Sequence, residues 1–153
     1  MIEVKRFKYS DKELLKMCNT IRTKVFIEEQ NVEPELEYEF EEDGNYFLLF
    51  YDKKPIATAR WRKTSKGIKL ERFAMLKEYR NKGIGSKLLG EVLKDVIHQK
   101  KKIYLHSQVS AVTYYERAGF VKKGDILDLT GFFNLLGLSE MLSQSEKKYR
   151  RIF

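Results

Sequence analysis

Residues 70–89 of this chain read L-E-R-F-A-M-L-K-E-Y-R-N-K-G-I-G-S-K-L-L, and this stretch decides the fold. It predicts an apolar strand over 68–75, a short polar loop over 80–86, and a helix that begins at about Ile84. Gly83 and Gly85 let the loop backbone approach a ligand closely. Free amides at the start of the helix, together with the positive end of the helix dipole, favour an anion there. We therefore predict that this loop binds a phosphate-bearing ligand.

Spacing excludes two other kinds of phosphate loop. A dinucleotide-binding fingerprint requires a third glycine three residues after the second, and that position is Leu88. A P-loop requires Gly-Lys-Ser/Thr after four spacer residues, whereas here the spacers lead from Gly85 to Gly90-Glu91-Val92. What remains is Arg80-x-x-Gly83-x-Gly85 after a strand, a pattern that a tight turn before a helix also satisfies.

Length and composition predict one globular domain. The chain has 153 residues, of which 42% are hydrophobic and 34% charged, as is ordinary for a folded domain. No apolar run approaches the roughly 20 residues that a membrane-spanning helix requires. Charged residues also interrupt the N-terminal segment where a signal peptide would have its apolar core. The single cysteine, Cys18, has no partner for an internal disulfide, so we expect a cytoplasmic protein.

The net charge of +8 requires that nucleic acid be considered as a partner. The basic residues are spread along the chain, however, and acidic clusters at 28–29 and 39–43 separate them. The densest basic run, 100–102, falls where a helix should end and would complement the helix dipole. No nucleic-acid-binding module is recognisable, so a nucleic-acid-binding domain is the less favoured reading.

The hydrophobic pattern predicts a mixed sheet with flanking helices, an α/β (α+β) fold. Strands are expected at 2–9, 46–51, 56–63, 68–75, 103–107 and 120–123. The second, third and fourth of these form an antiparallel meander. The strand at 103–107 follows a helical crossover and should lie parallel to the strand before that helix. Helices are expected from residue 10 to about 26, or on to 30, and at 84–97 and 111–118.

The first helix carries two local signals. Ser10-Asp11-Lys12-Glu13 reads as a capping box, in which Ser10 caps the helix and Glu13 reaches back to it. Cys18 lies among apolar residues at helical spacing, which is more typical of a core position than of a nucleophile. The acidic segment 31–45 that follows contains Pro34 and reads as a loop with at most one helical turn.

Three motifs stand in a fixed order along the chain. They are Leu70-Glu71-Arg72-Phe73-Ala74-Met75, the glycine loop, and Ala111-x-x-Tyr114-Tyr115-Glu116-x-x-Gly119-Phe120. Together they resemble the GNAT superfamily of acyl-CoA-dependent N-acetyltransferases over about residues 2–123. Arg22-x-x-Val25-Phe26-x-x-Glu29-Gln30 and Leu105-His106-Ser107-Gln108 resemble its small bacterial ElaA-type branch. The resemblance implies a single domain over 1–153 with a parallel β-α-β acyl-CoA-binding core, acetyl-CoA as co-substrate, and no metal.

The resemblance also implies how acetyl-CoA binds. The loop amides hold the pyrophosphate, and the pantetheine arm pairs like an extra strand with residues 73–75, in a V opened where the neighbouring parallel strand splays away. A strand bulge near Ala74 frees an amide, that of Met75, to polarise the thioester carbonyl. The cofactor-binding residues implied are Phe73, Ala74, Met75, Arg80, Asn81, Lys82, Gly83, Ile84, Gly85, Ser86, Ala111 and Tyr114.

In that family the acceptor amine attacks the thioester directly, and two residues here match catalytic positions. Tyr115 corresponds to a tyrosine near the CoA sulfur and is the candidate general acid; a core aromatic is the alternative. Glu71 is the candidate base, acting through water on an amine whose pKa is near 10. A cleft beside Glu71 would raise its pKa, whereas Arg72 and Arg60 would lower it and would make it an ion-pair residue. His106 is the second candidate base, because histidine titrates in the useful range.

The sequence does not determine the identity of the acceptor or the structure of the C-terminal segment. The family branch usually ends with a further strand and a Gly-Ile-x-His-x-x-Met stretch, but residues 131–141 lack that histidine. The acceptor is expected to be an amine of a small molecule or a protein, and Glu28, Glu29, Glu33 and Glu35 favour a cationic one. The sequence leaves room for a homodimer. A catalytically silent acyl-CoA-binding or sensor protein of the same fold is the alternative function.

Overall fold

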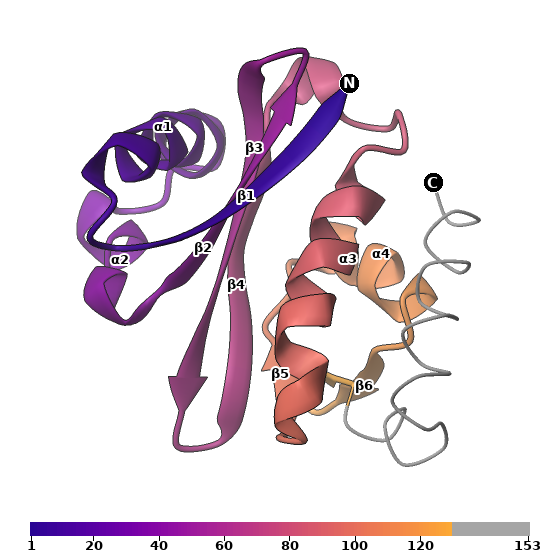
Figure 1. Ribbon diagram of the computed structural model, residues 1–153. Helices are drawn as coiled ribbons and strands as arrows, with labels where there is room; N and C mark the ends of the chain where they lie inside the picture. Colours follow the sequence, from indigo (N-terminus) through magenta and orange to yellow (C-terminus); the bar gives the residue numbers. More distant parts are fainter. Residues whose placement is uncertain (130–153) are drawn as a thin grey trace.

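The computed structural model describes residues 1–129 (Figure 1). The strands are β1 (Ile2–Lys8), β2 (Asn45–Tyr51), β3 (Lys54–Thr64), β4 (Gly67–Met75), β5 (Ile103–Leu105), β6 (Val121–Lys123) and β7 (Ile126–Asp128). The α-helices are α1 (Lys12–Arg22), α2 (Pro34–Glu37), α3 (Gly85–Val96) and α4 (Val112–Arg117). The remaining helical turns are the π-helix η1 (Thr23–Glu29) and the 3₁₀ turns η2 (Glu41–Asp43), η3 (Lys77–Tyr79), η4 (Ile97–Gln99) and η5 (Val109–Ala111). The predicted features of 131–141 lie outside the described residues.

Within residues 1–129 the strands form one mixed sheet in the order β1-β2-β3-β4-β5-β7-β6. Strands β1 to β4 pair antiparallel, and β5 pairs parallel with β4, so the predicted meander and crossover are confirmed. Helices α1 and α2 lie on one side of the meander, and the crossover helix α3 lies on the other (Figure 1). No helix in this part of the chain is long and apolar enough to cross a membrane.

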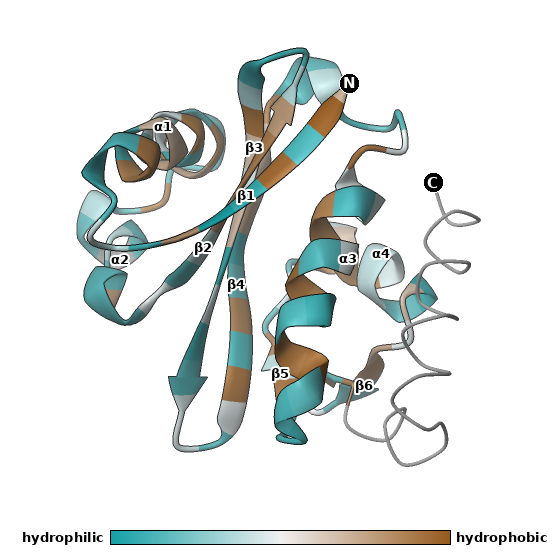
Figure 2. Cartoon of the chain, viewed as in Figure 1, coloured by the Kyte–Doolittle hydropathy of each residue, from teal (hydrophilic) through white to brown (hydrophobic). Residues whose placement is uncertain are grey.

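The core lies between the sheet and these helices. The apolar face of α3 is buried, with Leu89, Val92 and Val96 fully enclosed. Figure 2 shows hydrophobic and hydrophilic segments alternating along α3, as an amphipathic helix requires. Cys18 is fully buried, and burial raises the pKa of its thiol to about 12. The assignment of Cys18 to the core is therefore confirmed.

A local prediction at the start of the first helix was wrong. The N-cap of α1 is Asp11, whose Oδ1 accepts a hydrogen bond from the amide of Leu14, so the capping box of Ser10 and Glu13 does not form. The carboxylate of Asp11 takes over the capping role because the helix begins one residue later than the box requires. The sequence left the segment after residue 123 unassigned, and in the structure β7 follows β6 after the two-residue turn Gly124-Asp125.

Strand β7 inserts between β5 and β6, pairing antiparallel with both. It therefore covers the edge of β5 that faces away from β4. The sequence did not predict a strand at this edge. The acidic segment after η1 also forms more than the single turn expected, because η2 adds a 3₁₀ turn to α2. The first helix does continue beyond its α-helical part, as η1, to Glu29.

Candidate active site

Strands β4 and β5 separate soon after they meet. They pair only at Ile68 with Ile103 and at Lys69 with Tyr104. Beyond this point the edge of β4 up to Met75 has no neighbouring strand among the described residues. The expected V-shaped opening is therefore present between two parallel strands.

A bulge in β4 decides which backbone groups face this opening. The β3–β4 register changes between Arg60–Glu71 and Thr58–Ala74, so two residues, Arg72 and Phe73, oppose one. The bulge thus lies slightly before Ala74. The amide of Leu76 donates to the carbonyl of Ile56 on the β3 side, at 2.9 Å. Because strand residues alternate between their two edges, the amide of Met75 points the other way, into the opening.

A cavity of about 350 Å³ lies on the glycine-loop side of the opening, and we call it the loop-side cavity. Most of the predicted cofactor-binding residues line it, namely Phe73, Ala74, Met75, Arg80, Asn81, Gly83, Gly85, Ala111 and Tyr114. The other three do not: Lys82 is exposed, Ile84 is buried, and Ser86 donates its hydroxyl to the carbonyl of Gly83 at 2.9 Å. The structure thus brings residues from β4, the loop and α4 together around one space.

The loop backbone presents amides to this cavity. Gly83 has φ +79° and the following Ile84 has φ −78°, an alternation that turns successive amides to one side. Ile84 is the N-cap of α3 and makes no side-chain capping hydrogen bond. Among the described residues, no hydrogen-bond partner is found for the amides of residues 81–84. The N-terminus of α3 is therefore open to an anion.

Arg80 is held by two acceptors. Its Nε donates to the carbonyl of Met75 at 2.9 Å, and its Nη2 lies 2.9 Å from a carboxylate oxygen of Glu29. Glu29 belongs to η1, so this ion pair connects the end of η1 to the glycine loop. Both side chains are about one-third exposed, and an exposed pair of this kind is worth only about 0–1 kcal/mol. A stronger anion can therefore displace the carboxylate.

Tyr115 stands where two cavities meet. Its side chain is 7% exposed and packs edge-on against Phe73, Tyr114 and Phe120. Burial raises the pKa of its hydroxyl above the ordinary value, so the group stays protonated at neutral pH. No hydrogen-bond partner is found for this hydroxyl among residues 1–129. The neighbouring Tyr114 differs, because its hydroxyl donates to the carbonyl of Gly85 at 2.8 Å.

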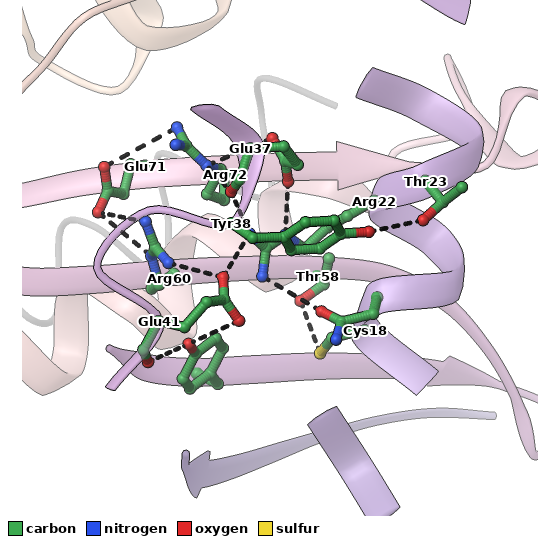
Figure 3. A network of polar contacts seen from close by, with 12 residues as sticks. Cys18, Arg22, Thr23, Glu37, Tyr38, Glu41, Thr58, Arg60, Glu71 and Arg72 are labelled. Atoms are coloured by element: carbon green, nitrogen blue, oxygen red, sulfur yellow. Dashed lines mark hydrogen bonds and ion pairs between the residues drawn. The ribbon is translucent and has the colours of Figure 1, made fainter. Parts of the chain in front are cut away.

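The second cavity, of about 310 Å³, lies on the other side of Phe73, Ala111 and Tyr115, which line both. Its charged lining comes from Glu37, Lys69, Glu71, Arg72 and His106. Behind it lies a buried network of ion pairs (Figure 3), so we call it the network-side cavity. The two cavities thus meet at these three residues.

The buried network joins the acidic segment to the sheet (Figure 3). Arg22 of α1 is 1% exposed; its Nε donates to Glu37 at 2.6 Å and its Nη2 lies 2.6 Å from Glu41. Arg60 of β3, also 1% exposed, contacts Glu41 at 3.0 Å and Glu71 at 2.9 Å. These pairs hold α2 and η2 against β3 and β4, beside the network-side cavity.

Glu71 is an ion-pair residue in this structure. Its Oε1 accepts from Arg62 at 2.6 Å and from Arg60 at 2.9 Å. Burial alone would raise the pKa of this carboxyl, but the charges of Arg60 and Arg62 outweigh burial and lower it. Of the two opposing effects on the Glu71 pKa, the attraction of the arginine charges is therefore larger than the effect of burial. A carboxylate with a lowered pKa is a weaker base.

His106, the second candidate base, is exposed and lines the network-side cavity. Of the four glutamates that suggested a cationic acceptor, none lines that cavity. Glu29 pairs with Arg80 as described above, whereas Glu33 and Glu35 are exposed. Their charge therefore says little about the acceptor. No group of His, Cys, Asp and Glu side chains within residues 1–129 is arranged to hold a metal ion.

Sequence reasoning missed the network itself. Arg22 falls on the apolar face of α1, where a charged side chain is rarely buried without a partner. The acidic segment that follows offered such partners in Glu37 and Glu41. Reading these two features together would have predicted the pairing, because a buried guanidinium requires carboxylates.

Comparison with known proteins agrees with this geometry. A family profile for the acetyltransferase (GNAT) domain matches residues 7–132. A protein described as the uncharacterized N-acetyltransferase YjcF of Bacillus subtilis strain 168 is 31% identical over 112 residues, 72% of this chain and 80% of that protein. The B. subtilis protein YyaT is 33% identical over 106 residues, 65% of this chain and 71% of its own length.

Two solved structures resemble the fold. Escherichia coli ElaA superposes with a TM-score of 0.71 at 21% identity, over 84% of this chain and 97% of ElaA. The PaiA N-acetyltransferase of Thermoplasma acidophilum, solved in complex with coenzyme A, superposes with a TM-score of 0.56 at 18% identity, over 84% of this chain and 96% of that one.

Proposed function

The chain belongs to the acetyltransferase (GNAT) family, and from this premise we propose that it transfers an acetyl group from acetyl-CoA to a primary amine by direct attack within a ternary complex. The observation that carries the proposal is the meeting of two cavities at Phe73, Ala111 and Tyr115, beside the unpaired edge of β4. Two substrates that react directly must meet at one point, and each cavity supplies one approach.

We assign the loop-side cavity to acetyl-CoA. The open N-terminus of α3 and the amides of residues 81–84 suit the pyrophosphate. The pantetheine arm would pair with the β4 edge at Phe73 and Met75. The bulge turns the Met75 amide toward the opening, where it can donate to the thioester carbonyl as negative charge develops on that oxygen. Arg80 would exchange Glu29 for a phosphate oxygen.

The acceptor amine enters from the network-side cavity. Its nitrogen, once neutral, forms a bond to the thioester carbon, and the carbon–sulfur bond then breaks to release CoA thiolate. We assign to Tyr115 the proton that the thiolate takes up. Burial raises the pKa of the Tyr115 hydroxyl, so this group is protonated when the thiolate forms, and burial would favour protonation of the thiolate for the same reason.

The proton released when the amide forms restores Tyr115 after the thiolate has taken its proton. An acceptor amine with a pKa near 10 must also lose one proton before it can attack. The arginine contacts of Glu71 weaken it as a base, so we assign this proton to His106 or to solvent and assign Glu71 to the ion-pair network. Both residues line the network-side cavity, and the pH profiles described below separate them.

The test combines binding and turnover. We expect acetyl-CoA at about 100 times its Kd to stabilise the fold by about 2.7 kcal/mol, seen as a rise in Tm. We expect free CoA to appear when a panel of primary amines is added. An unchanged Tm at saturating acetyl-CoA would overturn the proposal. Binding without CoA release for any amine would instead identify a silent acyl-CoA-binding protein.

A further inference from the structure

The two carboxylates that line the network-side cavity are paired with arginines that lie outside the cavity. Glu37 Oε1 accepts from Arg22 at 2.6 Å, and Glu71 Oε1 accepts from Arg62 at 2.6 Å. These are strong, charge-assisted hydrogen bonds. Their arginines come from α1 and β3 and do not line the cavity. The negative charge of both carboxylates is therefore directed away from any molecule in the cavity.

The cations on the cavity wall have longer contacts with the same carboxylates. Lys69 Nζ lies 3.7 Å from Glu71 Oε2, and Arg72 Nη1 lies 3.9 Å from that oxygen. The Nε of Arg72 donates to the backbone carbonyl of Glu37 at 3.1 Å and lies 3.4 Å from Glu37 Oε2. The two cationic side chains are 22% and 24% exposed, against 5% and 2% for Glu71 and Glu37. A molecule in the cavity therefore meets positive charge before it meets negative charge.

Within residues 1–129, the network contains more cations than carboxylates. Among the described residues, five cationic side chains contact three carboxylates, those of Glu37, Glu41 and Glu71. The cations are Arg22, Arg60, Arg62, Lys69 and Arg72. Burial lowers the pKa of Arg72, although the charges of Glu37 and Glu71 raise it.

The backbone holds Arg72 in place at an energetic cost. Arg72 has φ +58°, a left-handed conformation that costs a non-glycine residue about 1–2 kcal/mol. It occupies the first position of the β4 bulge, directly before Phe73, where the two cavities meet. The strained residue is therefore the cation nearest in the chain to the expected point of reaction.

We propose that the acceptor is a small amine that also carries a carboxylate, and that Arg72 and Lys69 bind this carboxylate while the amine reaches the thioester beside Phe73. The inference rests on the proposed acetyl transfer and names the substrate class of the same site. The cavity volume of about 310 Å³ is at the lower end of the range for small-molecule sites, about 300–1,000 Å³, and suits a molecule of amino-acid size. Lys69 and Arg72 on the cavity wall would repel a polyamine.

The test compares acceptors that differ only in the carboxylate. Suitable pairs are lysine with cadaverine, and 4-aminobutyrate with its amide. We expect kcat/KM for the carboxylate-bearing member of the accepted pair to be higher by about tenfold or more, equivalent to about 1.4 kcal/mol. The difference should reside mainly in KM for the acceptor, because the carboxylate is bound equally before and during the reaction.

Variants of Arg72 and Lys69 test where the carboxylate of the acceptor binds. Arg72→Gln and Lys69→Gln should each reduce the preference, and Lys69→Glu should shift it toward the uncharged or cationic partner. Lys66→Gln is the matched control, since Lys66 is an exposed residue of the β3–β4 turn and lines neither cavity. If Arg72→Gln does not fold, Lys69→Gln decides, because its single long contact with Glu71 contributes little to stability.

The outcomes separate the two proposals. If amines without a carboxylate are acetylated equally well or better, the inference is wrong while acetyl transfer stands. A preference that persists unchanged in both Lys69→Gln and Arg72→Gln also refutes the assignment of the carboxylate site. If no amine of either kind releases CoA, acetyl transfer itself is wrong and the inference falls with it.

Discussion

Replacing Tyr115 with phenylalanine should change stability and catalysis in different directions. The hydroxyl is buried with its ring at 7% exposure and has no hydrogen-bond partner within residues 1–129. An unpaired buried hydroxyl costs about 1–3 kcal/mol, less whatever cavity water recovers. Tyr115→Phe removes that group and keeps the ring contacts with Phe73, Tyr114 and Phe120. We therefore expect the free energy of unfolding to stay equal or to rise.

Catalysis should fall in the same variant. General acid catalysis contributes about 10²–10⁴-fold, so kcat should drop by about that factor if the hydroxyl protonates the CoA thiolate. The affinity for acetyl-CoA should stay nearly unchanged, because no phosphate or pantetheine contact is removed. The assay is CoA release at saturating acetyl-CoA and amine, paired with urea unfolding of the same preparation.

Tyr114→Phe is the matched variant. The hydroxyl of Tyr114 donates to the carbonyl of Gly85 at 2.8 Å, so its loss should destabilise the protein by about 1 kcal/mol. Its effect on kcat should be small, and its effect on KM for acetyl-CoA larger, because Gly85 belongs to the glycine loop. Wild-type kcat in Tyr115→Phe, or a clear loss of stability there, would refute our reasoning and return Tyr115 to a structural role.

Three further predictions test the loop, the candidate base and the network. Gly83→Val should weaken CoA binding by more than about tenfold, whereas Gly124→Val, at a glycine of φ +63° with no atom within 4 Å of an added Cβ, should carry similar strain and leave the affinity unchanged in a calorimetric titration. Glu71→Gln should keep the acidic limb of the kcat/KM profile, and His106→Ala should remove it if His106 is the base. The pKa of Glu71 is lowered in the folded state, so the ionised carboxylate stabilises the fold at pH values above its unfolded pKa of about 4.3. This stabilisation is lost as the pH falls through the folded pKa. The unfolding free energy of Glu71→Gln, measured with urea between pH 3 and 7, should therefore lack this pH-dependent contribution. Arg22→Met should lower the unfolding free energy by about 3–5 kcal/mol, because Glu37 and Glu41 lose the guanidinium that they share; a fall of less than about 1 kcal/mol would mean that Arg60 and Arg72 replace it.

The elements that the sequence predicted well are those whose pattern is long and local. The amphipathic face of α3, the apolar run of β2 and the glycine loop each follow from periodicity or turn chemistry within a single segment. Strand β7 has three residues and offers no period to detect. Its turn, Gly124-Asp125 between paired Lys123 and Ile126, does carry a two-residue hairpin signal that could have indicated it.

The cavity-lining residues also fall into two groups, those that a local motif predicts and those that it does not. Positions in the loop and β4 could be placed because one short motif contains them and the proposed contacts are made by their backbone. The charged wall could not be placed, because it joins α1, α2, η2, β3 and β4, and pairing between distant segments is not encoded in local spacing. The direction of the Glu71 pKa depended on such pairing. The sequence indicated that burial could raise this pKa and that arginine charges could lower it. The contacts of Arg60 and Arg62 show that the arginine charges have the larger effect.

The bulge at Arg72 and Phe73 connects the two halves of the site. One extra residue in β4 reverses which backbone groups face the V, so the amide of Met75 is turned into it instead of being used in the β3–β4 ladder. The same extra residue places Arg72 in its left-handed conformation on the wall of the network-side cavity. In the proposed reaction, a single backbone irregularity would thus supply both the donor for the thioester oxygen and the cation for the acceptor. Its strain is offset by the network that holds Arg72 between Glu37 and Glu71, so the positions of donor and acceptor groups depend on the same buried ion pairs.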